Sequence, residues 1–393
     1  MSGLVVVEPS IVAAALDPDR LLADAAAEAG SDDFGEPSGD EALRRWLDAI
    51  PQTGGLHAGG VQAVVANTHR LLVNRARIAA AFRAHPEILD RELSPPIVVA
   101  GMPRTGTTKL QRTLSLDPGV QSLPVWKLLF PAPLPGPAGQ DVRPAAAQAA
   151  MDMLADHFPD VMAAHPTGPA EADEDTFLQE LSFEGILSAY RVRVPEYKQW
   201  WLNHSQTDAY EYLRRVLLYL QWQDQREKPA PFVLKSPGHL GHLDVLAKIF
   251  PGATVVHCHR DPRVATPSMA RLLEVYRRMA SDVIDLAEIG DEVLRDWSGW
   301  WAANIGQRST IGSVLRIVDV GYEEIDANPA AVVESIYRAH DLAITPAFAS
   351  LLDQQGLAGA PHRFGRHAYS LERFGLTATR VEQAFTPYLD RFG

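Results

Sequence analysis

Cysteine, long apolar runs and positive charge are scarce in this chain. Cys258 is the single cysteine among 393 residues, so the chain can form no intrachain disulfide and no cysteine-based metal cluster. No stretch approaches the roughly 18 apolar residues of a membrane span. The first residues, MSGLVVVEPS, lack the basic segment and long apolar run of a signal peptide. These absences predict a cytoplasmic protein with no membrane span.

Acidic residues outnumber basic ones by 49 to 36, which gives a formal charge of −13. This balance argues against a surface for nucleic acid or another polyanion, but it is compatible with a local basic pocket for one nucleotide. The length fits one large domain or a domain with a helical elaboration. We therefore expect a small-molecule partner and no nucleic acid, and we leave a homodimer open.

The most informative segment is Pro96–Leu110, PIVVAGMPRTGTTKL. A short apolar run predicts a strand, which leads into a glycine- and threonine-rich turn and a helix start. Strand–loop–helix directs backbone N–H groups and a helix N-terminus at a phosphate. The spacing is that of a Walker A loop, but Thr107 stands where the lysine that grips the β- and γ-phosphates belongs, and Arg104 supplies a cation earlier. The loop therefore predicts a nucleotide whose 5′ group is not a triphosphate.

Four short apolar runs alternate with helical patterns, which predicts an α/β fold with a P-loop-like parallel sheet flanked by helices. The runs are Ile97–Ala100, Phe232–Leu234, Thr254–Cys258 and Val314–Val320. We expect a helical N-terminal region over 1–92 and the α/β domain over 93–393. About 130 residues separate the first two runs, and helical patterns in them, such as 145–158, 173–188 and 208–225, predict a substrate lid at about 125–228.

Two basic residues directly follow predicted strands, Lys235 after the second and Arg260 after the third. The carboxyl ends of such strands converge on one crevice, where the glycine- and threonine-rich loop also begins. Lysine can reach a phosphate as a point charge, and arginine can grip it with two N–H groups. Ser268 stands eight residues beyond Arg260, where its hydroxyl can return to the same anion.

PRTGTT at 103–108, LKSP at 234–237 and HRDP at 259–262, with a serine eight residues past that arginine, resemble the sulfotransferases that use 3′-phosphoadenosine-5′-phosphosulfate. More narrowly, the chain is similar to a bacterial group in that family. Shared features are Asp33-Phe34-Gly35, a W-x-x-x-x-P segment at 126–131 and a Y-S-x-x-x-F-G-L segment at 369–376. The resemblance therefore spans nearly the whole chain.

The resemblance implies this phosphosulfate donor. No metal is expected to be needed for the transfer. It implies that the 5′-phosphosulfate is held by the loop, with the cofactor-binding set comprising Arg104, Thr105, Gly106, Thr107, Thr108 and Lys109. It further implies that Arg260 and Ser268 hold the 3′-phosphate, and that Arg363 or Arg366 closes over that phosphate.

Sulfuryl transfer needs an acceptor in line with the breaking S–O bond and cations for the charge that grows on the leaving phosphate. We expect Lys235 and Arg104 to supply that charge. Related sequences often have an acidic base where this chain has Lys127, so we expect His239 to be the base. The alternatives are that His239 makes only local hydrogen bonds, that Lys127 binds an anionic acceptor, or that no strong base is needed. A lid carboxylate within Glu171–Glu180 is a further alternative, although a solvated face is the plainer interpretation.

The function expected is transfer of a sulfuryl group to a hydroxyl or amine of a small, partly apolar acceptor. One alternative is an atypical P-loop small-molecule kinase, which the missing Walker lysine and the pair of Arg260 and Ser268 disfavour. Another is a nucleotide-binding homologue without transfer activity. Sulfation that only activates a hydroxyl for elimination or cyclisation also stays open. No metal site is expected, because no Glu or Cys completes a set with His239, His242, His257 and His259.

Overall fold

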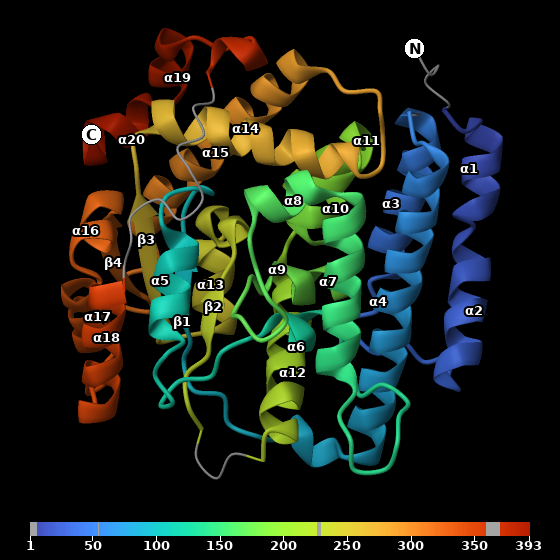
Figure 1. The fold of residues 1–393 in the computed structure, drawn as a ribbon, viewed down its shortest axis with the longest axis horizontal. Coiled ribbons are helices and arrows are strands. Elements are labelled where there is room, and N and C mark those ends of the chain that lie inside the picture. Colours follow the sequence, from blue (N-terminus) through green and yellow to red (C-terminus); the bar gives the residue numbers. More distant parts are fainter. Residues whose placement is uncertain (1–5, 54, 226–228, 359–369) are drawn as a thin grey trace.

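A computed structural model describes residues 6–53, 55–225, 229–358 and 370–393. Within these ranges, four parallel strands form one sheet that helices surround (Figure 1). The strands are β1 (Ile97–Ala100), β2 (Val233–Lys235), β3 (Thr254–His259) and β4 (Arg316–Gly321). The predicted α/β fold with a parallel sheet is thus confirmed, although β2 and β4 begin one and two residues later than the apolar runs suggested.

The strand order is β2-β1-β3-β4, with Val98 of β1 facing Leu234 of β2 and Val255 of β3. The chain leaves β1 for β2 on one side and then crosses to β3 on the other. In such a sheet the ligand crevice lies at the carboxyl ends of the two strands where the order reverses, here β1 and β3. The loop after β1 and the segment after β3 therefore flank one opening.

The two faces of the sheet bury different partners, because successive side chains of a strand point to opposite faces. Ile97 and Val99 belong to a smaller core with helices on one face of the sheet. Those helices are α5 (Thr107–Leu114), α16 (Tyr322–Ala327), α17 (Pro329–Ala339) and α18 (Pro346–Ala358). Val98 and Ala100 face a larger core that the lid and the N-terminal helices share.

Helices that follow β2 and β3 supply much of the larger core. They are α13 (Leu243–Ile249), α14 (Pro262–Arg278) and α15 (Leu286–Arg308), with α19 (Ala378–Ala384) and α20 (Thr386–Phe392) beyond them. Single 3-10 turns lie at η3 (Pro237–Gly241) and η4 (Glu372–Phe374). Asp261 caps α14 by accepting a hydrogen bond from the Arg263 N–H, and Pro262 supplies the fixed backbone angle suited to a first helical residue.

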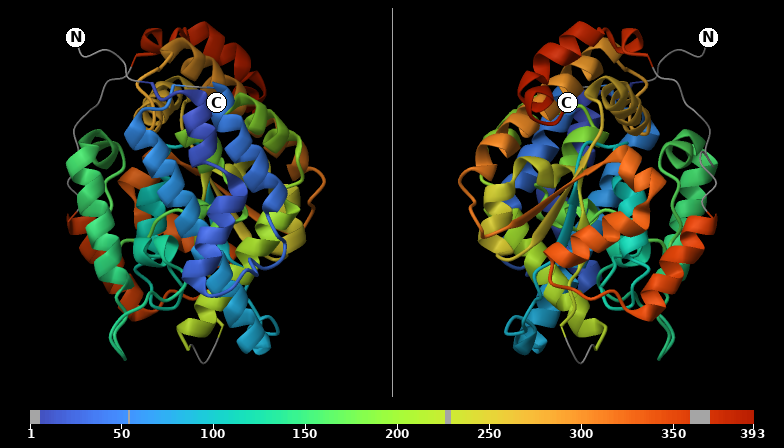
Figure 2. Two further views of the ribbon diagram at one scale, coloured as in Figure 1. Left: turned by 90° about the vertical axis from the view of Figure 1, so that its right-hand side faces the viewer. Right: turned by 90° about the vertical axis from the view of Figure 1, so that its left-hand side faces the viewer.

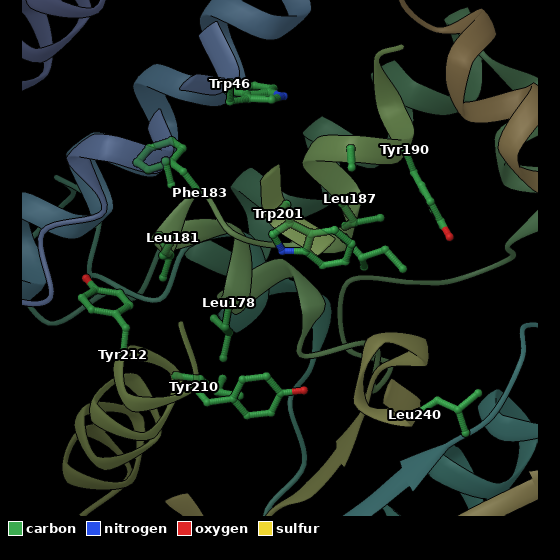
Figure 3. Packing of buried hydrophobic residues seen from close by; sticks show 14 of the residues in the cluster. Trp46, Leu178, Leu181, Phe183, Leu187, Tyr190, Trp201, Tyr210, Tyr212 and Leu240 are labelled. Atoms are coloured by element: carbon green, nitrogen blue, oxygen red, sulfur yellow. The ribbon is translucent and has the colours of Figure 1, made fainter. Parts of the chain in front are cut away.

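The segment between α5 and β2, which we call the lid, is mostly helical. It consists of α6 (Val125–Leu129), α7 (Arg143–His157), α8 (Pro159–Ala164), α9 (Thr176–Gln179), η2 (Glu180–Ser182), α10 (Ile186–Arg191), α11 (Pro195–Asn203) and α12 (Thr207–Gln223). The prediction of a helix over 173–188 is wrong, because Phe183 takes a left-handed φ of 60° and Gly185 is extended, so the chain turns twice. Trp201, Tyr210 and Tyr212 fill the core around these turns (Figure 3).

Four helices precede the sheet and pack along the lid (Figures 1 and 2). They are α1 (Pro9–Ala15), α2 (Pro18–Ala29), α3 (Asp40–Thr53) and α4 (Ala58–Ala84), followed by η1 (Pro86–Ile88). The fully buried guanidinium of Arg75 donates hydrogen bonds to the carbonyls of Phe34, Gly35 and Pro37 and to that of Leu181 in η2. One side chain therefore joins the Asp33-Phe34-Gly35 segment to the lid, and burial lowers its pKa.

No helix in the described ranges is both long enough and apolar enough to cross a membrane.

Candidate active site

The loop from β1 to α5 is held tightly against β3. A Cβ on Gly101 would lie 2.7 Å from the Cys258 carbonyl oxygen, so only glycine fits there. Gly106 has a φ of 90°, which glycine adopts without strain. It is also the N-cap of α5 and offers no side-chain acceptor to the first-turn N–H groups. These N–H groups have no partner within the helix, so they are available to an anion at the crevice.

Two arginines meet at this loop. The Arg260 Nη1 donates to the Arg104 carbonyl at 2.7 Å, and its guanidinium carbon lies 3.9 Å from the Tyr322 ring centroid. Arg104 has a left-handed φ of 75° and donates through Nη1 to the Ala164 carbonyl at 3.3 Å. In the described part of the chain neither arginine forms an ion pair with a carboxylate. Two cations therefore meet at the loop, Arg104 within it and Arg260 directly after β3, and no carboxylate of the described residues compensates their charge.

The other residues predicted to bind the donor differ in how deeply they are buried. Thr105 and Thr107 are buried, and the Thr105 hydroxyl donates to the Met102 carbonyl at 2.7 Å. Thr108 is half-buried in the first turn of α5. Ser268 is half-buried on α14, about 9 Å along the axis from Pro262 at 1.5 Å per residue.

Lys109 differs from its neighbours in the loop. Its ammonium forms an ion pair with Asp326 of α16 at 2.8 Å on the surface, so its side chain is directed at that helix. Arg363 and Arg366 lie outside the described residues.

Three consecutive carboxylates, Asp173–Asp175, lie just before α9, and we call them the acidic tripeptide. Each one holds a different basic side chain. The pairs are Asp173 with His165 at 2.9 Å, Glu174 with Lys235, and Asp175 with His239 at 3.1 Å. The interpretation of this stretch as a solvated face is wrong, because the side chains of Asp173 and Asp175 are 1% and 0% exposed. Glu180 is also buried and paired with Arg191 at 2.8 Å.

Backbone contacts fix the acidic tripeptide to the sheet. The Lys235 N–H donates to Asp175 Oδ1 at 2.7 Å, and the Asp175 N–H donates to the Lys235 carbonyl at 3.2 Å. From α5, Gln111 Nε2 donates to the Asp173 carbonyl at 2.8 Å. The lid is therefore anchored both to the end of β2 and to the helix that follows the loop.

The Lys235 ammonium is 2% exposed and contacts Glu174 at the carboxyl end of β2. Its positive charge is close enough to lower the pKa of Asp173. Burial raises the pKa of Asp173, but the His165 imidazole and the Lys235 ammonium outweigh that effect and hold the pKa well below its usual range. Asp173 is therefore a carboxylate, which can only accept hydrogen bonds.

His239 is fully buried, with both ring nitrogens engaged. Nδ1 lies 2.8 Å from the Tyr210 hydroxyl and Nε2 lies 3.1 Å from Asp175. Burial lowers the pKa of the neighbouring His242 to about 4. Lys127 on α6 is also buried, and its ammonium forms an ion pair with Asp224 at 2.5 Å. Neither His239 nor Lys127 lines the cavity described next.

A cavity of about 300 Å³ lies within the lid, between the N-terminal helices and α14. Most of its lining is apolar, with His165 and Asp173 among the few polar side chains. Sequence reasoning did not single out His165. It stands in the turn HPTGP, follows no predicted strand and has no spacing that relates it to a motif. Its proximity to Asp173 is visible only in the folded lid.

The remaining histidines near the sheet bind protein groups. His257 Nε2 lies 3.0 Å from the Asn304 amide, and His259 Nε2 lies 2.8 Å from Asp319. Among the described residues, no group of three or more His, Cys, Asp or Glu side chains is arranged to hold a metal ion.

The geometry brings the glycine- and threonine-rich loop, two arginines with no carboxylate partner among the described residues, and a buried lysine together at the carboxyl ends of the strands. The model of the sulfotransferase family matches residues 95–346, which is more than half of the chain. The chain belongs to the sulfotransferase family. It is therefore an enzyme that transfers a sulfuryl group, of class EC 2.8.2, as the sequence motifs predicted, and not a P-loop kinase.

Individual members of the family are similar over most of their length. The sulfotransferase STF9 of Mycobacterium avium superposes with a TM-score of 0.82 at 27% identity, covering 95% of this chain and 96% of that one. STF1 of Mycobacterium tuberculosis gives 0.77 at 28% identity, covering 94% and 98%. The omega-hydroxy-beta-dihydromenaquinone-9 sulfotransferase Stf3 of Mycobacterium bovis is 23% identical over 313 residues, which are 76% of this chain and 75% of the relative.

Proposed function

We propose that this sulfotransferase moves a sulfuryl group from 3′-phosphoadenosine-5′-phosphosulfate to a hydroxyl or amine of a small, partly apolar acceptor. The observation that carries the proposal is the meeting of Arg104 and Arg260 at the N-terminus of α5, with no carboxylate partner among the described residues. A site built this way suits a ligand that brings several negative charges of its own.

In this proposal the loop and the first turn of α5 hold the 5′-phosphosulfate, with Arg104 beside them. Arg260 and Ser268 hold the 3′-phosphate. Arg260 leads directly into α14, so a phosphate bound there lies between the loop and that helix.

Lys235 has the catalytic role in the transfer. The acceptor atom attacks sulfur, the S–O bond to the 5′-phosphate breaks, and its electron pair stays on the phosphate oxygen. Glu174 holds the Lys235 ammonium at the end of β2, where it can stabilise that growing charge. We assign His239 to orienting Asp175, since neither of its ring nitrogens is free.

The proposed acceptor class has support from two sources. The mycobacterial relative Stf3 is named for an omega-hydroxylated menaquinone derivative, which is a largely apolar molecule that carries a hydroxyl. The lid cavity of this chain is itself mainly apolar. A further elimination or cyclisation of the sulfated product, a cytoplasmic location and a homodimer stay predictions.

Calorimetric binding of adenosine 3′,5′-bisphosphate tests the donor site. We expect magnesium-independent binding that is tighter than that of ATP. Replacing a charged hydrogen-bonding partner costs about 2 kcal/mol, so Arg260→Ala should weaken the affinity about thirtyfold. Arg263→Ala is the matched control, because Arg263 lies three residues on and pairs with Asp261 and Glu382. Preference for ATP, or equal effects of the two substitutions, would refute the proposed donor.

A further inference from the structure

The lid cavity has an apolar wall and a mouth at the surface. Its lining includes Trp46, Val64, Met151, Leu154 and Phe177, which come from four different helices. Ala63 of α4 and Ala150 of α7 also line it and are exposed, so the cavity opens between these two neighbouring helices (Figure 1). A volume of about 300 Å³ is at the lower end for small-molecule sites.

His165 connects the cavity to the donor loop. It lines the cavity, and the carbonyls on either side of it are held from the donor side. Arg104 of the loop donates to the Ala164 carbonyl at 3.3 Å, and Arg112 of α5 donates to the Pro166 carbonyl at 2.9 Å. The end of the cavity formed by His165 therefore lies next to the place where the loop would hold the sulfuryl group.

Asp173 determines which nitrogen of His165 carries the proton. His165 Nε2 lies 2.9 Å and 3.0 Å from the two carboxylate oxygens. A carboxylate only accepts, so in the neutral ring Nε2 is the N–H donor and Nδ1 holds the lone pair. Nδ1 has no hydrogen-bond partner among the described residues. This is the arrangement in which an acid orients a histidine that acts as a base.

The other titratable groups that line the cavity are less suited to accept a proton. Glu180 is ion-paired with Arg191 at 2.8 Å. Burial raises the pKa of Tyr276, so its hydroxyl stays protonated. Asp173 already accepts from His165 and from the Glu174 N–H at 2.8 Å. His165 Nδ1 is thus the cavity's available basic atom in the described structure.

Resting on the donor assignment above, we propose that the lid cavity binds the apolar part of a hydroxylated acceptor and that His165, oriented by Asp173, takes the proton of its hydroxyl. The hydroxyl oxygen forms a bond to sulfur as the S–O bond to the 5′-phosphate breaks. The proton moves to Nδ1 of His165, and the electron pair of the broken bond goes to the phosphate. His165 is the catalytic base, and Asp173 is a positioning residue.

The first test measures the apolar site without turnover. Primary alkanols from butanol to dodecanol are titrated by calorimetry into enzyme saturated with adenosine 3′,5′-bisphosphate. Each buried methylene should tighten binding about fourfold, which corresponds to about 0.8 kcal/mol, until the cavity is full. Ala150→Phe should abolish the gain for the long alkanols alone. Ala149→Phe, on the exposed neighbouring position outside the lining, is the matched control.

The second test separates a base from a structural histidine. An alkanol must lose its proton during transfer, whereas 4-nitrophenol at mildly alkaline pH is largely ionised already. His165→Asn should therefore lower kcat about a hundredfold or more for dodecanol and less than about tenfold for 4-nitrophenol. Asp173→Asn should show the same selectivity. His157→Asn is the control, because His157 is exposed at the end of α7, where it hydrogen-bonds the Met153 carbonyl and contacts the Phe158 ring.

Three results would overturn the inference. They are alkanol binding that does not depend on chain length, equal losses for the two acceptors in His165→Asn, and a wild-type enzyme that transfers to neither acceptor. Retained binding of adenosine 3′,5′-bisphosphate in these cases would leave the donor assignment intact. Loss of that binding in the wild-type enzyme would instead refute the proposed function.

Discussion

Two arginines on the proposed donor side of the site lack a carboxylate partner among the described residues, whereas three basic groups on the proposed acceptor side are each paired with a carboxylate. Arg104 and Arg260 bind backbone carbonyls, and within the described chain no carboxylate neutralises them. Across the crevice, Lys235 and the two imidazoles of His165 and His239 each have a carboxylate from the acidic tripeptide. The arginines without carboxylate partners and the basic groups with them thus lie on opposite sides of the position where sulfur would be transferred.

This difference fits the chemistry of the two proposed ligands. A phosphosulfate donor brings its own negative charges, so free arginines gain ion pairs when it binds. An apolar acceptor with one hydroxyl brings none, and an unpaired charge beside it would carry a large desolvation cost. The protein therefore supplies the counter-charges on the acceptor side itself.

The largest effect is expected at Lys235, where the two sides meet. Lys235→Ala removes the cation proposed to stabilise the leaving phosphate, and kcat should fall about a hundredfold to a thousandfold, or about 3–4 kcal/mol. The affinity for adenosine 3′,5′-bisphosphate, measured by calorimetry, should change much less.

The double variant Lys235→Ala with Glu174→Gln is the control for the charge left behind. It should recover stability that the single variant loses, because Glu174 is no longer unpaired, yet its kcat should stay low. Recovery of kcat in the double variant would show that Lys235 acts by neutralising Glu174 rather than by stabilising the transition state.

A smaller effect is expected at Glu184, a buried lid carboxylate with weak compensation. Burial, and then the charges of Asp208 and Glu41, raise its pKa from 4.5 to about 7. The folded state therefore holds this proton more tightly than the unfolded chain, so stability is highest below pH 4.5 and is lost as the pH rises through about 7. Glu184→Gln should stabilise the protein by up to about 3 kcal/mol at about pH 8 and little at about pH 4.

Urea denaturation midpoints at the two pH values measure this difference. Glu196→Gln, on an exposed position at the start of α11, should shift neither midpoint. A pH-independent effect of Glu184→Gln would contradict the raised pKa of Glu184. A loss of stability at about pH 8 would mean that the carboxylate is compensated like Asp173.

The smallest effect is expected at Lys109, whose ammonium is paired with Asp326 and directed at α16. Lys109→Ala should therefore change the affinity for adenosine 3′,5′-bisphosphate by less than about 1 kcal/mol, or less than about fivefold. Arg104→Ala, measured beside it, should weaken binding more than about tenfold. Equal losses would show that the Lys109 ammonium leaves Asp326 for the ligand. Lys109 would then belong with Arg104 and Arg260 among the cations available to the donor.

The donor side was largely predictable because its parts are local in sequence. In the proposed site the donor is bound by backbone N–H groups, a glycine turn, the last residue of β2 and the residue directly after β3, and the position of each is set by a short segment. Parallel strands then bring these segments to one edge whatever lies between them. The positions of Lys235 and Arg260 followed from that rule. The side-chain direction of Lys109 did not, because it depends on α16, more than 200 residues away.

The acceptor side could not be predicted in the same way. In sequence the acidic tripeptide resembles a solvated run, but α5 and β2 contact and bury it in the folded protein. His165 lies beside Asp173 because the chain turns back between α8 and α9. The apolar wall combines helices from the N-terminal region, the lid and α14. Such contacts depend on packing between distant segments, which neither periodicity nor spacing records.

The acidic tripeptide also restricts how this chain can change in length. The three carboxylates are consecutive in the chain. A one-residue insertion or deletion there would shift each carboxylate into its neighbour's position, opposite the wrong basic partner. His165, Lys235 and His239 would all be mismatched at once. Among the described residues, no other turn around the cavity pairs three consecutive carboxylates with three basic partners. We therefore expect insertions and deletions that change the acceptor preference, but keep transfer, at the mouth between α4 and α7. We do not expect them at residues 173–175.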